Sequence, residues 1–448
     1  MTGNSVGRAA TSLPSARLLS LPISLTISVI VVWVLTRVFA AVALSRSGGS
    51  ILVDIQLYEV WAGIASGGAA PEGDETWQSP PVMLLPVWLG QLLPWDYQPS
   101  FVFLALLGDL MVLISVLALR RSSNASWLGV WVWATAGLWI GPLLLARLDV
   151  FTTLPAIAAL AFLSRPALSG AFAAIGALMK VWPGALLIAL PRRQLPWGIA
   201  GFAASVVVLW AFSTVVLDDA WSFLTNQQSR GLNGESLAAT PFIVANYLGF
   251  DIQFEHRFGS NEVAMTSADT TAGVIAALGI VLIVLLVLLR MMGALERALP
   301  ADVGLIAVLS LVLVSRVFSP QYLIWLGALA AVALLSRDTR MRMPAALIVI
   351  SGFLTQPLYP WFPGAIYSGE PWAVLLHVLR MLLLLIALIH GFRVIVDWNA
   401  VKSLLRQPLS FRKKHRHDSK NRYAGNHVDP TQAAVLGQPQ SPQHPDRE

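Results

Sequence analysis

The chain has 448 residues, of which 56% are hydrophobic and only 12% are charged. Because soluble domains carry about a quarter charged residues, this composition excludes an ordinary soluble globular protein. The sequence holds no cysteine, which excludes disulfides, zinc-thiolate sites and cysteine nucleophiles. Its net charge of +6 lies in short loops and in the tail, which indicates membrane orientation and not nucleic-acid binding.

Apolar runs near the ~20 residues needed to cross a bilayer recur along nearly the whole chain. Because backbone groups in hydrocarbon must be hydrogen-bonded internally, these runs predict helices. We therefore predict an all-α, polytopic integral membrane protein with about twelve transmembrane helices. Residues 1–18 are predicted to be a cytoplasmic N-terminal segment, residues 19–396 the multi-span domain, and residues 397–448 a basic, disordered cytoplasmic tail.

The first apolar run, residues 19–44, follows Arg8 and Arg17 and ends in small residues that resemble a signal-peptidase site. Its length is roughly twice that of a signal-peptide core, so we predict an uncleaved span. Basic clusters between the later runs, placed in the cytoplasm, fix the direction of each crossing and put both termini inside. The further predicted spans are residues 101–119, 127–145, 150–163, 197–217, 272–289, 303–318, 322–335, 344–359 and 372–396.

Two apolar segments depart from this pattern. Residues 81–95 are short and rich in proline, which predicts a membrane-surface or re-entrant helix instead of a span. Residues 166–191 would end on the wrong side as a single span, so Lys180 and Pro183 are predicted to split them into two short helices. The junction of these helices would lie outside, and breaks of this kind usually line a cavity.

On this topology, polar side chains gather on the outer face. An ionisable group at such a depth is costly and is by default a functional candidate. The cations in the outer turns are Arg147, Lys180, Arg230 and Arg316. Beside a carboxylate they suit an anionic, phosphate-bearing lipid, because Arg and Lys bind phosphate while Asp54 can take the proton of an attacking hydroxyl. The candidate substrate-binding residues are Tyr58, Gln228, Glu235, Gln321 and Tyr322.

Simpler structural roles are the alternatives for these residues. Asp is a common N-cap, so Asp54 can instead begin a surface helix, and single cations can extend to the membrane interface without a ligand. The acidic stretch of Glu72, Asp74 and Glu75 is predicted to be a solvated loop, with cation binding as its alternative. The lone histidines are predicted to pack or to form hydrogen bonds, so no metal site is predicted.

Five short motifs narrow the choice. They are Asp54 after the first span, Ser79-Pro80-Pro81, Gly176 with Lys180 and Pro183, the stretch from Gln228 to Ser236, and Phe318-Ser319-Pro320-Gln321-Tyr322. Together they resemble glycosyltransferase family 87 of the GT-C superfamily, which includes polyprenol-phosphate-mannose-dependent α-mannosyltransferases of actinobacterial envelopes. The resemblance covers residues 37–322, and the stretch around Arg230 is its most specific part.

The resemblance implies a membrane enzyme of GT-C type with extracytoplasmic juxtamembrane helices and an outward-facing active site. The donor would be a polyprenyl-phosphate sugar, with mannose expected, the acceptor an envelope glycolipid or lipoglycan, and transfer would invert the anomeric centre. Asp54 would be the catalytic base, and Lys180, Arg147 and Arg230 would hold the donor phosphate without a metal or another cofactor. The turn at residues 319–322 lacks the histidines of the phosphatidylinositol mannoside branch, which indicates a different acceptor.

A secondary transporter or lipid flippase is the alternative function, because such proteins also have about twelve spans and broken helices. A transporter would place ionisable residues near mid-span in symmetric halves, whereas the residues above lie at the outer ends of the predicted spans. A non-enzymatic scaffold for envelope assembly is a third alternative. It leaves the combination of Asp54 and Arg230 unexplained.

Overall fold

The computed structural model describes residues 23–47, 49–120 and 124–406, and most of them are helical. Five helices are long and apolar enough to cross a membrane. They are α1 (Ile23–Arg46), α4 (Tyr97–Leu119), α10 (Leu195–Val216), α13 (Thr266–Met291) and α17 (Pro371–Ile395). The prediction of a mostly helical chain is therefore confirmed, and these five helices support the prediction of a multi-pass membrane protein.

The other predicted spans are shorter or broken helices, so the count of about twelve spans stays a prediction. For example, α14 (Pro300–Leu313) has 14 residues. A helix of that length rises about 21 Å, against about 30 Å of hydrocarbon. The other helices of this kind are α5 (Leu128–Ala134), α6 (Ala136–Trp139), α7 (Leu143–Ala146), α8 (Asp149–Ala161), α9 (Pro166–Ala177), η5 (Trp182–Ala189), α15 (Tyr322–Ala333), α16 (Arg342–Gln356) and η7 (Pro357–Trp361).

The run at residues 127–145 shows how such a break arises. Gly141 adopts a φ of +66°, a conformation that favours glycine, and Pro142 follows it. The run is therefore divided among α5, α6 and α7. The predicted split near Lys180 is present as well, because α9 ends at Ala177 and η5 begins at Trp182.

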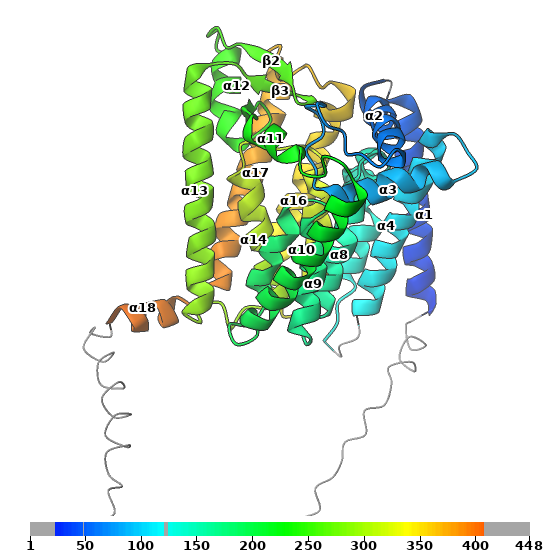
Figure 1. Ribbon diagram of the computed structural model, residues 1–448. Coiled ribbons are helices and arrows are strands. Elements are labelled where there is room, and N and C mark those ends of the chain that lie inside the picture. Colours follow the sequence, from blue (N-terminus) through cyan, green and yellow to red (C-terminus); the bar gives the residue numbers. More distant parts are fainter. Residues whose placement is uncertain (1–22, 48, 121–123, 407–448) are drawn as a thin grey trace, which may run out of the picture. The chain divides into compact units, whose positions relative to one another are not determined.

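The helix α2 (Gly49–Ser66) follows α1, and two later regions fold into short elements. The proline-rich residues 81–95 form short helices, as predicted, here η3 (Pro81–Met83), α3 (Leu84–Leu89) and η4 (Gly90–Leu92). The long loop at residues 218–271 contains α11 (Phe223–Gln228), η6 (Leu237–Ala239) and α12 (Thr240–Tyr247). Figure 1 shows β2, β3 and α12 at the upper end of α13.

A small sheet in this loop corrects the all-α prediction. The strands β1 (Leu232–Asn233), β2 (Phe254–Arg257) and β3 (Ser260–Val263) form an antiparallel sheet in the order β1-β3-β2. Leu232 and Phe254 both pair with Val263, from opposite sides. Strands of two to four residues are too short to show the alternating pattern by which a strand is recognised in sequence.

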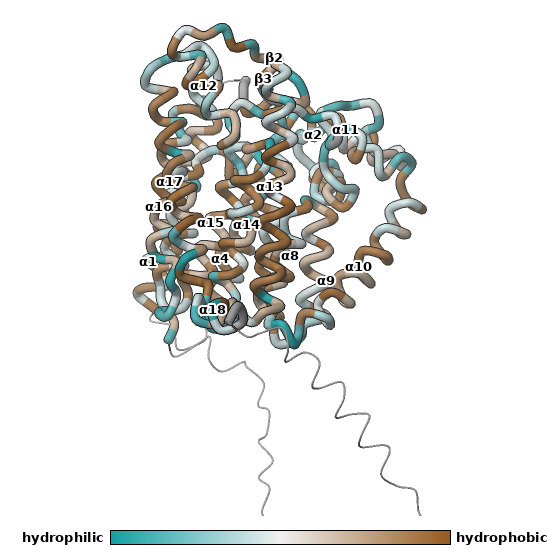
Figure 2. Tube along the Cα trace, turned by 90° about the vertical axis from the view of Figure 1, so that its left-hand side faces the viewer, coloured by the Kyte–Doolittle hydropathy of each residue, from teal (hydrophilic) through white to brown (hydrophobic). Residues whose placement is uncertain are grey.

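The distribution of burial fits a lipid environment. Almost every residue of α14 and α15 is buried, whereas only 6% of the apolar window of α10 and 22% of that of α13 is covered by protein. Apolar surfaces of this size on outer helices require hydrocarbon around them. Figure 2 shows hydrophobic residues along the middle of the helices and hydrophilic residues in the loops at their ends.

The turns that carry the basic clusters contact one another. The Arg337 amide donates to the Asn124 carbonyl at 3.1 Å, and the Arg192 amide donates to Glu296 Oε1 at 2.9 Å. At the other ends of the helices, Asn226 Nδ2 donates to the Asp74 carbonyl at 2.8 Å. Loops that the basic clusters assign to one face of the membrane therefore lie together.

Glycines allow α9 and α10 to pack at close range. A Cβ atom at Gly170 would lie 1.9 Å from the Gly198 carbonyl oxygen, and one at Gly201 would lie 2.0 Å from that of Ala167. We expect Gly170→Ala to destabilise the protein by about 1–3 kcal/mol, because backbone must move apart. Thermal unfolding in detergent measures this. Gly273→Ala in α13 meets open space and is the matched control, and equal melting temperatures for both variants would contradict the packing.

The described residues form two compact units. Those up to Asp397 belong to the first, and α18 (Trp398–Arg406) belongs to the second. The start of the predicted tail is thus helical. The predicted N-terminal segment and the rest of the tail lie outside the described residues.

Candidate active site

A cavity of about 790 Å³ gathers most of the predicted site residues. Its lining comes from α2, the α7–α8 junction, the α9–η5 junction, α11, the β2–β3 turn, α13, α14 and α15. The predicted residues that line it are Asp54, Tyr58, Arg147, Lys180, Arg230, Gln321 and Tyr322. Residues far apart in the sequence are therefore brought to one place.

Asp54 lies inside α2 and not at its start. Because α2 begins at Gly49, an N-cap role is excluded. Asp54 is partly exposed to the cavity, and its Oδ2 forms an ion pair with Arg147 Nη1 at 2.6 Å. Arg147 is extended (φ −123°, ψ 146°) between α7 and α8, which directs a nearly buried guanidinium at the carboxylate.

Lys180 occupies the junction between α9 and η5. Its amide donates to the Gly176 carbonyl at 2.8 Å, and a Cβ at Gly176 would lie 2.7 Å from Pro183 Cβ, so the Gly176, Lys180 and Pro183 pattern is one packed turn. The Lys180 ammonium is 2.7 Å from Asp149 Oδ1. The Trp325 indole N–H donates to the same oxygen at 2.7 Å.

Asp149 is a buried carboxylate that was not among the predicted site residues. The available signal was its position two residues after Arg147, in a short polar step between apolar helices. Around it stand aromatic rings: Trp182 stacks on Trp325 with centroids 5.2 Å apart, and Tyr322 stacks on Trp325 at 3.9 Å. These rings form one wall of the cavity beside the Lys180–Asp149 pair.

Arg230 is fixed by residues of the sheet and of the loop before α3. Its Nε is 3.2 Å from Glu262 Oε1, its Nη2 donates to Ser260 Oγ at 2.6 Å, and its Nη1 donates to Gln78. The aromatic ring of Phe258, at the tip of the β2–β3 hairpin, lies 5.7 Å from the guanidinium. Sequence reasoning missed Glu262 and Gln78, because no local pattern marks residues that meet Arg230 only after folding.

Three predicted residues are not brought to the cavity wall. Arg316 donates to the carbonyl oxygens of Arg230 and Gln227, each at 2.8 Å, and so supports the backbone of Arg230. Glu235 pairs with the fully buried Arg380 at 3.1 Å. Burial raises the pKa of Glu235, although the Arg380 charge opposes this shift. Gln228 ends α11, and its side chain lies outside the described part of the structure.

Each cation in the cavity has a carboxylate partner. Arg147 pairs with Asp54, Lys180 with Asp149, and Arg230 with Glu262. Burial alone would lower the pKa of Arg147, but the charge of Asp54 and the interactions with Tyr359 and Tyr58 outweigh it and raise that pKa well above the usual value. The cations of the cavity are therefore stabilised in their charged forms by the neighbouring carboxylates, which also fix their positions.

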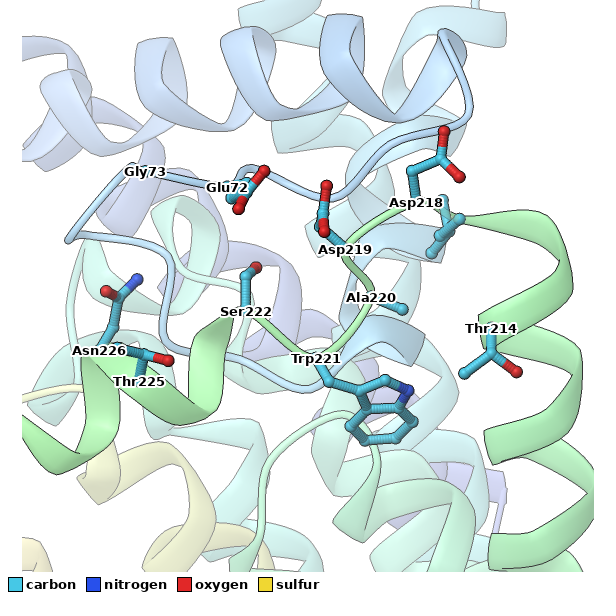
Figure 3. Close-up of a pocket in the computed structure, with 11 residues that line it drawn as sticks. Glu72, Gly73, Thr214, Asp218, Asp219, Ala220, Trp221, Ser222, Thr225 and Asn226 are labelled. Carbon is cyan, nitrogen blue, oxygen red and sulfur yellow. The ribbon is translucent and has the colours of Figure 1, made fainter.

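A second cavity of about 580 Å³ lies on the other side of α11 and is acidic. Figure 3 shows Glu72 facing Asp219 there, and a hydrogen bond with Asp219 raises the pKa of Glu72. Asp74 instead accepts from Trp61 Nε1, and Glu75 accepts from the Phe258 amide. The acidic stretch is thus divided among separate contacts. In the part of the chain that the structure describes, no group of three His, Asp or Glu side chains is arranged for a metal ion.

Comparison with protein families shows which family the chain belongs to. Residues 77–320, more than half of the chain, match glycosyltransferase family 87. The chain belongs to this family. The match contains three of the cations that line the cavity and their partners Asp149 and Glu262, whereas Asp54 precedes it. No curated protein and no solved structure matches this glycosyltransferase.

Membership of family 87 makes the protein a membrane glycosyltransferase, which requires a sugar donor and an acceptor. The resemblance noted in the sequence is therefore confirmed for the matched residues. The identities of the sugar, of its carrier and of the acceptor are matters for the proposal that follows.

Proposed function

We propose that this glycosyltransferase transfers mannose from a polyprenyl-phosphate donor to an envelope glycolipid or lipoglycan, with inversion. The observation that carries the proposal is that the large cavity has a cationic part and an apolar part. One part holds Arg147, Lys180 and Arg230. Another is lined by apolar residues of α13, of α14 and of the C-cap of α14, namely Ala276, Gly279, Ile280, Ile283, Val284, Leu311, Val312 and Val314.

An amphiphilic donor suits both parts. Lys180 and Arg230 offer charge-assisted hydrogen bonds to a phosphate, and the aliphatic wall offers a surface for the first isoprene units. A nucleotide sugar would place a polar base against the same aliphatic wall, at the cost of its hydration. The cavity therefore favours a lipid-linked donor.

The chemistry follows from the positions of the charges. The acceptor hydroxyl attacks the anomeric carbon while Asp54 takes its proton. The bond from the anomeric carbon to the phosphate oxygen breaks, and the negative charge that develops on the leaving polyprenyl phosphate lies beside Lys180 and Arg230. A single displacement of this kind inverts the anomeric centre, so a β-linked mannosyl donor yields an α-mannoside.

The orientation in the membrane is part of the proposal. The basic turns that contact one another are placed in the cytoplasm with both termini, following the positive-inside rule. The cavity, α11 and the sheet then lie on the extracytoplasmic side. Polyprenyl-linked sugars are the donors that such a face allows, because they carry the sugar on a membrane anchor.

Removal of either phosphate-binding cation is expected to weaken donor binding. We expect Lys180→Met and Arg230→Met each to raise the donor KM by about 10- to 100-fold, the loss of a charge-assisted hydrogen bond. The measurement is transfer of labelled mannose from polyprenyl-phosphate mannose by purified protein. Arg257→Met is the control, because Arg257 is an exposed cation of the β2–β3 hairpin that does not line the cavity. An unchanged donor KM in both cavity variants would contradict this phosphate site.

A further inference from the structure

Arg147 joins three distant parts of the chain. Its Nη1 lies 2.6 Å from Asp54 Oδ2, and its Nη2 donates to the Tyr359 hydroxyl. The Tyr58 hydroxyl interacts with the same guanidinium. Tyr359 lies in η7, after α16, and has an extended conformation there (φ −147°, ψ 125°). The guanidinium is thus held by α2 on one side and by η7 on the other.

The partners of Arg147 set it apart from the other cations of the cavity. The side chain is only 11% exposed, and a buried cation needs both a counter-charge and hydrogen-bond acceptors. Asp54 supplies the charge, and the two tyrosines supply neutral oxygens. Arg230 is also buried, with a side chain 8% exposed, but its carboxylate partner is Glu262 of the sheet. Only Arg147 among the three cations is paired with the proposed base, Asp54.

The contact also sets the orientation of the Asp54 carboxylate. Arg147 holds Oδ2, and within the described residues Oδ1 takes part in no other hydrogen bond, so it is available to an acceptor hydroxyl in the cavity. Asp54 and Tyr58 are one helical turn apart on α2 and meet Arg147 from the same face of that helix. A carboxylate fixed at one oxygen presents the other in a constant direction.

We propose that Arg147 and Tyr359 are positioning residues for the Asp54 base and do not bind the donor phosphate. This inference rests on the proposed function and changes the role that was predicted for Arg147 from the sequence. It also adds Tyr359, which lies beyond the matched residues 77–320. Two residues outside the family match, Asp54 and Tyr359, are therefore joined through one inside it.

The test compares kcat and donor KM in three variants. Tyr359→Phe removes only a hydroxyl and is expected to lower kcat by about 5- to 20-fold, as expected for the loss of one hydrogen bond, at an unchanged donor KM. Arg147→Met is expected to lower kcat further, again at an unchanged donor KM, because Asp54 loses the contact that holds its Oδ2. Arg147→Lys keeps the positive charge beside Asp54, so its kcat should fall less than that of Arg147→Met.

Other ionisable groups around this contact are Tyr58, Asp149 and Glu235, which remain unchanged in all three variants. Tyr247→Phe, an exposed tyrosine of α12, is the matched control and should transfer sugar like the wild type. A purely structural role would lower the amount of folded protein without lowering kcat per folded molecule.

The possible failures can be told apart. A raised donor KM with unchanged kcat in Arg147→Met would overturn the inference and return Arg147 to the phosphate site, with the proposed function intact. Wild-type rates in Tyr359→Phe would overturn the part that concerns Tyr359. Absence of transfer by the wild type itself would contradict the proposed function instead.

Discussion

Asp54→Asn is expected to lower kcat for sugar transfer by about 10²- to 10⁴-fold, the range attributed to a general base. The amide keeps the size of the side chain but cannot take the proton of the acceptor hydroxyl. The donor KM should change little, because Lys180 and Arg230 stay in place. Steady-state transfer of labelled mannose at varied donor concentration measures both quantities.

Glu59→Gln is the matched control for this prediction. Glu59 lies on the same helix, α2, but is exposed and does not line the cavity. Its variant should transfer sugar at the wild-type rate. Full activity in Asp54→Asn, together with loss of activity in Asp149→Asn, would show that the buried carboxylate beside Lys180 is the base and would contradict the role given to Asp54.

Asp109→Ala is expected to destabilise the protein by about 3–5 kcal/mol, the usual cost of an unpaired buried charge. Arg37 of α1 and Asp109 of α4 form a two-point ion pair at 2.7 and 2.8 Å, with side chains 4% and 0% exposed. Without Asp109, the Arg37 guanidinium keeps neutral acceptors, namely the carbonyl oxygens of Trp133 and Ala134 and the Thr36 hydroxyl oxygen. A lower melting temperature in detergent would report the loss.

Two further variants separate the charge from the packing. In Arg37→Met with Asp109→Leu both charges are gone, and much of the lost stability should return, since an apolar pair of similar volume needs no counter-charge. Arg297→Ala removes a cation that is 77% exposed in its pair with Asp397. That change should cost less than about 1 kcal/mol. Equal losses for Asp109→Ala and Arg297→Ala would contradict the account of the buried pair.

The features that the sequence predicted are those written in local patterns. Apolar runs of sufficient length gave α1, α4, α10, α13 and α17, because lipid demands both the composition and the helix. The break near Lys180 was predictable, since a proline and a charged residue interrupt an apolar run. Lys180 and Arg230 were predictable as cavity residues for the same reason: charge in an apolar setting is costly and is kept for a purpose.

The features that were missed depend on partners distant in the sequence. Arg230 meets Glu262 across 32 positions, and Arg147 meets Tyr359 across 212. Neither partner shows a local signal, because a tyrosine in a short segment such as η7 or a glutamate in a four-residue strand is ordinary by itself. Arg316 has the same residue type and setting as Arg230, yet its donors are used by backbone oxygens. Only the folded arrangement separates these cases.

The most direct test of a lipid-linked sugar transferase is made in liposomes that contain the purified protein, β-linked polyprenyl-phosphate mannose with a labelled sugar, and an envelope glycolipid fraction. The account predicts a labelled α-mannoside in the glycolipid fraction and release of an equal amount of polyprenyl phosphate, with neither product from the Asp54→Asn protein. Movement of intact donor across the bilayer without a new mannoside would contradict it and would identify a lipid flippase.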